Sequence, residues 1–105
     1  MSEAIKIRAS IKGSEGEVRV LMPHPMESGL RKDPSGRIPP AHFIIQVSLS
    51  LNGRPVIEGA LGTSVSANPL FAFQLKDVKP GDRVAVSWLD NTGQKGAAET
   101  VFSTA

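Results

Sequence analysis

The chain has 105 residues, a formal net charge of +2 at pH 7 and no cysteine. This length fits one domain with a single core, and 40% hydrophobic with 21% charged residues is typical of a water-soluble globular protein. The lack of cysteine excludes disulfides and thiolate sites. Basic and acidic residues are interleaved, which argues against a nucleic-acid-binding surface.

Two strands are predicted at the start of the chain. Apolar and polar residues alternate from Ile5 to Lys12, the pattern of a half-buried strand. After a Gly-rich turn, the segment 17–22 is expected to return as a second strand and to stop at Pro23, which cannot donate to a ladder. The first residues lack the apolar stretch of a secretory signal, and no segment has the length of a membrane span.

A long loop is predicted from Pro23 to Pro40, where Pro, Gly, Ser and charged residues predominate without periodicity. Long loops in small domains are uncommon and often functional, so a binding role is expected first in this segment. Its charges, Glu27, Arg31 and Lys32 among them, indicate either a recognition surface or plain solvation. Glu27 and Arg31 would form an ion pair if the segment coils into a turn.

The strongest predicted strand follows this loop, from His42 to Leu51. Strict alternation places Phe43 and Ile45 on the core face and His42 and Ile44 on the opposite face. Because that opposite face also carries an apolar residue, we expect Ile44 to lie in a subunit interface.

A hairpin is predicted next. Asn52-Gly53 favours positive φ at both central positions of a tight turn, so the segment 54–58 should pair with the preceding strand. Pro55 indicates that this second arm lies at a sheet edge.

Three further strands are predicted at 70–75, 83–88 and 97–102, separated by turn residues. About seven short strands without a helical period predict one all-β domain over residues 1–105, an immunoglobulin-like antiparallel β-sandwich. Trp88 is its expected core anchor.

The sequence offers no catalytic site. The segment Gly62–Ser66 lacks the final glycine of a nucleophile elbow. Asp77, Asp82 and Asp90 lie beside turn residues, where aspartate hydrogen-bonds its own backbone. We therefore predict that the chain is not an enzyme, has no catalytic residue and needs no cofactor.

A metal site is the alternative interpretation. Met22, His24 and Met26 stand at alternate positions, and two thioethers with an imidazole suit monovalent copper in a β-sandwich. His42 is the other histidine available. The competing interpretation is that both methionines pack at the edge of the core.

The segment from His24 to Asp33, HPMESGLRKD, resembles the SoxZ family, the small subunits of the carrier complex in bacterial sulfur oxidation. Further segments resembling that family follow in the same order, at 40–44, 52–53, 64–73 and 88–93. Together they extend from Met22 to the last predicted strand.

The resemblance implies an immunoglobulin-like subunit that forms a heterodimer with SoxY, whose C-terminal cysteine carries sulfur intermediates during thiosulfate oxidation. It implies indirect contact with the other sulfur-oxidation enzymes, no nucleic acid or membrane partner, and a periplasmic location reached by co-export with the partner. An isolated chain could form a homodimer. The candidate partner-binding residues are His24, Met26, Glu27, Arg31, Lys32, His42, Phe43 and Ile44.

Overall fold

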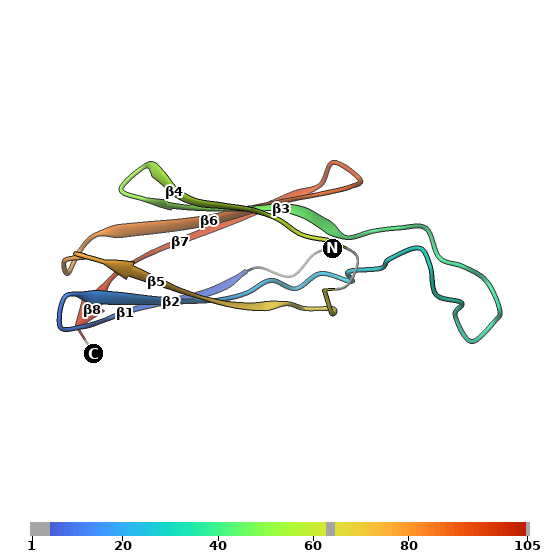
Figure 1. Cartoon of the computed structure of the whole chain (residues 1–105), viewed down its shortest axis with the longest axis horizontal. Coiled ribbons are helices and arrows are strands. Elements are labelled where there is room, and N and C mark those ends of the chain that lie inside the picture. The colour runs from blue at the N-terminus through green and yellow to red at the C-terminus, as the bar shows by residue number, and fades with distance from the viewer. Residues whose placement is uncertain (1–4, 63–64, 105) are drawn as a thin grey trace.

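The computed structural model describes residues 5–62 and 65–104. Thr63 and Ser64, part of the segment compared with a nucleophile elbow, lie outside it, as do the first four residues considered for a secretory signal. The described residues form eight strands in two four-stranded sheets that face each other (Figure 1). They contain no helix that could cross a membrane.

The first sheet has the order β5-β2-β1-β8. It contains β1 (Lys6–Lys12), β2 (Glu15–Leu21), β5 (Leu70–Lys76) and β8 (Ser103–Thr104). β8 is short and runs parallel to β1, whereas β1, β2 and β5 pair antiparallel. The chain thus crosses between the sheets near its end, which the sequence did not predict.

The second sheet has the order β4-β3-β6-β7, with every pair antiparallel. It contains β3 (Ile44–Leu51), β4 (Arg54–Ala60), β6 (Arg83–Asp90) and β7 (Lys95–Val101). The predicted all-β, immunoglobulin-like sandwich class is confirmed, and the short β8 accounts for the difference from about seven strands.

The core lies between the sheets, where the inward residues of β2, β3 and β6 meet. Val18, Val20, Leu49 and Val84 are fully buried, as the alternation of facing strands requires. Trp88 is 5% exposed, so its predicted role as a core residue is confirmed.

The predicted hairpin is present between β3 and β4. Asn52 and Gly53 have φ values of 51° and 84°, the two positive values that a type I′ turn requires. β4, which carries Pro55, lies at the edge of its sheet, so that prediction is also confirmed.

The predicted faces of β3 are wrong at its start. Ile44 pairs with Asp90 and Gln46 with Leu89, so Ile45 is an extra residue in a bulge. A bulge shifts every residue before it to the other face. Ile44 is therefore fully buried and Ile45 is 36% exposed, the reverse of the expectation that Ile44 faces outward.

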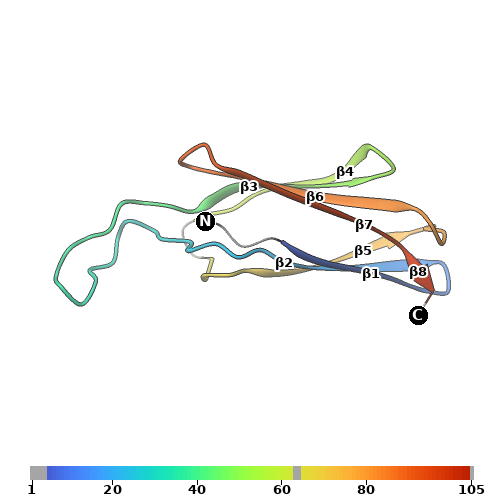
Figure 2. The ribbon, with the colours of Figure 1, turned by 180° about the vertical axis from the view of Figure 1, so that it is seen from behind.

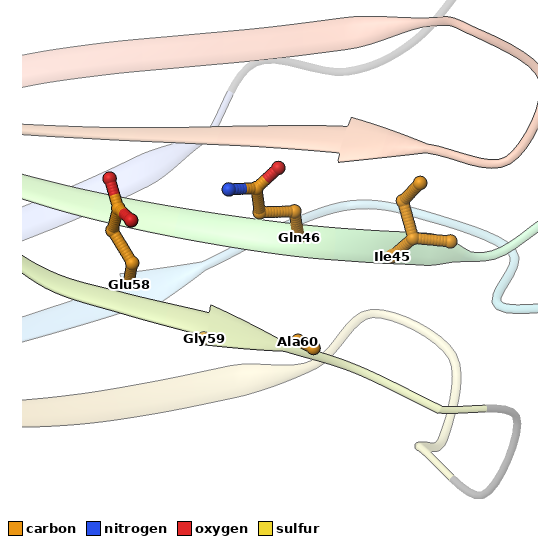
Figure 3. Close-up of a pocket in the computed structure, with 5 residues that line it drawn as sticks. All are labelled: Ile45, Gln46, Glu58, Gly59 and Ala60. Carbon is orange, nitrogen blue, oxygen red and sulfur yellow. The ribbon is translucent and has the colours of Figure 1, made fainter.

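Ile45 lies on the outer surface of the sheet. Together with Gln46, Glu58, Gly59 and Ala60 it lines an open hollow of about 330 Å³ over β3 and β4 (Figure 3). An outward side chain in the bulge is thus placed where a partner can reach it.

The segment between β2 and β3, residues 22–43, extends away from both sheets and is called the projecting loop here (Figure 1). It contributes to the elongated shape, whose extents are 52 × 23 × 22 Å. The prediction of a long loop from Pro23 to Pro40 is confirmed, whereas His42 and Phe43, which were expected in the following strand, precede β3 and belong to the loop.

Candidate functional site

The projecting loop leaves and returns to the sandwich as a closed hairpin. Glu27 N donates to His42 O at 2.7 Å and His42 N donates to Glu27 O at 2.8 Å. These bonds form an isolated antiparallel bridge that holds the outgoing and returning arms together. The segment beyond the bridge therefore projects from a fixed base.

Below the bridge, both histidines contact one carboxylate. His24 Nε2 lies 3.0 Å and His42 Nε2 lies 2.9 Å from Asp90 Oδ2. The other oxygen, Asp90 Oδ1, accepts bonds from Thr92 N, Thr92 Oγ1 and Gln94 N. We call His24, His42 and Asp90 the histidine–aspartate cluster. It joins both arms of the loop to the end of β6.

Asp90 is 1% exposed, and burial by itself raises the pKa of a carboxyl group. The hydrogen bonds from the Thr92 hydroxyl, His24 and the Gln94 and Thr92 amides oppose this and lower the pKa of Asp90 well below its ordinary value of 3.8. The carboxylate is therefore ionised in the folded protein at neutral pH. Its predicted turn-forming role is confirmed, and it also has these loop contacts.

The hydrogen bonds of His24 fix its tautomer. Its Nδ1 accepts the Met26 backbone N–H at 3.0 Å, so the ring proton of the neutral form is on Nε2 and points to Asp90. The ring also packs edge-on against Trp88, with centroids 5.1 Å apart. His24 is thus a buried anchor for the loop.

Met26 completes this anchor through its backbone and its sulfur. It has a φ of 47°, a left-handed conformation uncommon for a side chain of this type. Its Sδ accepts the Ile44 N–H at 3.3 Å. Both Met22 and Met26 are buried, which agrees with packing at the core as the competing interpretation of these methionines.

Within the part of the chain that the structure describes, the donor atoms of the histidine–aspartate cluster all lie within 4.8 Å of one another, close enough to hold a metal ion. They differ from the predicted set, Met22, His24 and Met26. A metal at His24 Nε2 would need a lone pair on that nitrogen, but the hydrogen bond from Met26 N to Nδ1 implies that Nε2 carries the proton. Moving the proton to Nδ1 would place it against the Met26 N–H. The geometry therefore favours a hydrogen-bonded anchor.

Asn91 holds the returning arm next to this cluster. Its Oδ1 accepts from Phe43 N at 2.8 Å and its Nδ2 donates to Ala41 O at 2.8 Å. The Asn91 N–H in turn donates to Phe43 O. The turn after β6 therefore binds the returning arm of the loop at both Ala41 and Phe43.

The tip of the loop is closed by Asp33. Its Oδ1 accepts from Ser35 N, Ser35 Oγ and Arg37 N, and its backbone bonds to Gly36 and Arg37. The hydrogen bond from the Ser35 hydroxyl is the largest cause that lowers the pKa of Asp33. The tip is thus a defined turn with a charged carboxylate.

Basic and apolar side chains are exposed beyond the bridge. Arg31, Lys32 and Arg37 are exposed, and Leu30 and Ile38 are 78% and 56% exposed. Large apolar side chains this exposed on an otherwise ordered loop are typical of contact surfaces.

The structure separates the predicted candidates into three groups. His24, Met26 and His42 come together at the base, and Arg31 and Lys32 lie at the tip. Ile44 is core, and Phe43 is half-buried beside it.

Glu27 does not form the ion pair with Arg31 that the sequence allowed, because no such pair occurs among the described residues. Its Oε1 is enclosed and makes no hydrogen bond to described protein atoms.

Sequence reasoning missed Asn91 and Gln94, and it did not connect Asp90 to the loop. These contacts depend on the pairing of β3 with β6, which places Ile44 beside Asp90. An alignment of the two predicted strands 42–51 and 83–88 as neighbours would have brought His42 to the turn at 90–93.

The family model described as "Sulphur oxidation protein SoxZ" matches residues 5–101. No curated protein sequence matches the chain.

Similar solved structures include the superoxide reductase (neelaredoxin) from Ignicoccus hospitalis, with 18% identity and a TM-score of 0.65, covering 99% of this chain and 82% of that one. Two single-substitution variants of that reductase give TM-scores of 0.64 and 0.63 with the same identity and coverage. At 18% identity this likeness shows the fold alone.

Proposed function

The chain belongs to the SoxZ family of sulphur oxidation proteins, and we propose that it is a non-catalytic subunit that pairs with a SoxY-like protein. The partner would carry sulfur intermediates on a C-terminal cysteine during thiosulfate oxidation. This chain would support the partner and help to present it to the enzymes of the pathway. The family match over residues 5–101 is the observation on which the proposal depends.

The geometry of the projecting loop supports a role in protein contact. Its base is held by the Glu27–His42 bridge and by Asp90, and its tip is closed by Asp33. A loop ordered before binding loses less conformational entropy when it meets a partner. Exposed Leu30 and Arg31 then provide apolar and charged contacts.

A non-catalytic role agrees with the chemistry of the cluster. The His24 side chain is 2% exposed and both of its ring nitrogens are hydrogen-bonded. A general base needs access to a substrate proton, and His24 has none. His42 is 33% exposed but bonds to Asp90 and Gln94, so its position is explained by anchoring the loop.

The contact residues we propose are those at the tip, Arg31 and Lys32 with their exposed neighbours Leu30 and Ile38. His24, Met26 and His42 would act on partner binding through the position of the loop. Ile44 is replaced as a candidate by Ile45, because the bulge exposes Ile45 and buries Ile44.

The compartment forms part of the proposal. We expect the chain in the periplasm, exported together with its partner. Fractionation of cells that contain or lack the partner tests this: the chain should leave the cytoplasm only when the partner is present, and export without the partner would contradict it.

The pairing is tested by purifying a tagged copy from its native cells grown on thiosulfate and measuring the intact mass of what elutes with it. We expect a stoichiometric companion that ends in a Gly-flanked cysteine and carries sulfur adducts. A chain that elutes alone with bound copper would contradict the proposal and favour the alternative copper-binding function.

A matched pair of variants tests the loop. The double substitution Arg31→Glu with Lys32→Glu should reduce recovery of the companion. Arg8→Glu with Lys12→Glu changes the charge equally at positions of β1 and should leave recovery unchanged. Equal recovery with both variants would show that the tip does not contact the companion.

A further inference from the structure

β7 is an edge strand of its sheet, and part of it lies close to β1 of the facing sheet. It has a hydrogen-bonded neighbour, β6, on one side, and it ends the order β4-β3-β6-β7. Its register with β6 is continuous from Leu89↔Lys95 to Arg83↔Val101. Figure 2 shows β7 in front of β6. An edge strand presents unpaired backbone N–H and C=O groups on its outer side, to which another strand can pair.

The opposite edge of the same sheet is protected. β4 contains Pro55, and its register with β3 shifts between Leu49 and Ser50. A proline and a bulge are the usual devices that prevent an edge strand from pairing further. β7, with the sequence KGAAETV, has neither.

Side chains on β7 permit close approach of another strand. Lys95, Ala97, Glu99 and Val101 are exposed on the outer face, and the residues between them are half-buried. Those inward residues are Gly96, Ala98 and Thr100. The small residues at the centre of the strand place no bulky side chain beside an incoming backbone.

The charges on β7 complement a second copy in one register. When two β7 strands pair antiparallel about Ala97, Lys95 of each lies opposite Glu99 of the other. Oppositely charged residues directly across an antiparallel pair attract, and like charges repel. A shift by two residues places Lys95 against Val101, and a shift by four places two glutamates or two lysines face to face.

β5 forms the other long edge, but it lacks this complementarity. It is regular along its pairing with β2, yet Lys76 is its one charged residue. No acidic residue on that strand can meet Lys76 of a second copy. The charge pattern therefore distinguishes β7 from β5.

We propose that two copies of this chain associate through antiparallel pairing of β7 with β7, with Lys95 facing Glu99 of the other copy. A two-fold axis through Ala97 makes the contact isologous and closed. The sheet β4-β3-β6-β7 of one copy then continues into the same sheet of the other copy. This association concerns the isolated chain and is separate from pairing with a SoxY-like protein.

A charge-swap series with the purified chain, without any partner, tests this pairing. Sedimentation equilibrium should show a concentration-dependent dimer for the unaltered chain. Lys95→Glu or Glu99→Lys alone places like charges opposite each other and should weaken dimerisation about tenfold or more. The double variant Lys95→Glu with Glu99→Lys restores unlike pairs and should recover the dimer.

Glu58→Lys is the matched control, because it makes the same charge change on the exposed edge strand β4. It should dimerise like the unaltered chain. A chain that stays monomeric, a double variant that does not recover, or a Glu58→Lys variant as weak as Glu99→Lys each overturns the proposal.

Hydrogen exchange of the unaltered chain gives a test without variants. Amides of β7 should gain protection as the chain concentration rises, whereas those of β5 should not. Protection of β7 that is independent of chain concentration and increases only when a SoxY-like companion is added would overturn association with a second copy, while leaving the proposed function intact.

Discussion

His42, in the returning arm of the loop, and Asp90, at the end of β6, are joined by a hydrogen bond of 2.9 Å between Nε2 and Oδ2. His24, in the outgoing arm, bonds to the same oxygen at 3.0 Å. A single buried carboxylate therefore fixes both ends of the projecting loop.

Replacing Asp90 should destabilise the whole domain. Asp90→Ala removes an acceptor for His24, His42, Thr92 and Gln94, and buried donors left without partners are costly. We expect the free energy of unfolding to fall by about 3 kcal/mol or more, measured by urea denaturation. Asp82→Ala, in an exposed turn, should have a smaller effect. Equal losses of unfolding free energy in the two variants would show that the contacts of Asp90 with the loop histidines add no stability beyond that of its turn.

The same carboxylate predicts acid sensitivity. The pKa of Asp90 is lowered from 3.8 in the folded protein, so the unfolded chain takes up this proton first as the pH falls. The stability contributed by Asp90 is complete above the unfolded value. It is lost progressively below about pH 3.8, as the pH falls toward the folded pKa.

Asp90→Asn isolates this contribution, because the amide does not titrate. We expect the unaltered chain to be more stable than Asp90→Asn at neutral pH, and the difference in free energy of unfolding to shrink as the pH is lowered. A difference that stays constant between neutral pH and pH ~3 would assign the acid sensitivity to other groups.

A lysine should destabilise the fold at Ile44 and be tolerated at Ile45. Ile44→Lys places an ammonium group in the core, where Ile44 is fully buried, and should prevent stable folding. Ile45→Lys, in the exposed bulge, should leave the free energy of unfolding within about 1 kcal/mol of the unaltered value. Thermal denaturation of both variants checks this, and a stably folded Ile44→Lys would place that side chain outside the core.

Gly96 should not tolerate a side chain. A Cβ at this position would overlap the indole of Trp88, so Gly96→Ala must displace the tryptophan or the strand. We expect a loss of about 1–3 kcal/mol together with a changed tryptophan fluorescence spectrum. Gly59→Ala in β4, where nothing lies within 4 Å of the added carbon, is the control and should leave the spectrum unchanged.

Metal binding should be weak at the predicted thioether site. Met26 Sδ accepts the Ile44 N–H and both nitrogens of His24 are hydrogen-bonded, so a metal would have to displace these bonds. We expect less than stoichiometric copper after dialysis against Cu(I), measured by elemental analysis. Stoichiometric copper that is lost in His24→Gln would instead support the alternative function.

Local patterns in the sequence were sufficient for much of the fold. Asn52-Gly53 predicted its turn through the conformations that the two residues favour, and alternation predicted the strands that contain Ile11 and Trp88. The bulge at Ile45 was not predictable from alternation, since one inserted residue reverses the faces before it. β8 was missed because two residues are too few to show a period.

The location of the candidate site was predictable from the sequence, but the residues that meet there were predictable only in part. Composition identified the loop, and the resemblance identified its family. The convergence of His24, His42 and Asp90 depends on a tertiary pairing across 48 and 66 residues of sequence. Such a contact cannot be predicted from the secondary-structure propensity of the residues or from their spacing within a short segment.

The loop also divides the chain at a favourable place for proteolysis. Trypsin can cut at Arg31 or Lys32, which leaves β1 and β2 on one fragment and the remaining strands on the other. β2 pairs with β5 and β1 with β8, so the smaller fragment lies between two strands of the larger. A nicked chain should therefore migrate as one particle under native conditions and separate only in denaturant. Digestion thus becomes a way to interrupt the contact surface while the sandwich remains assembled.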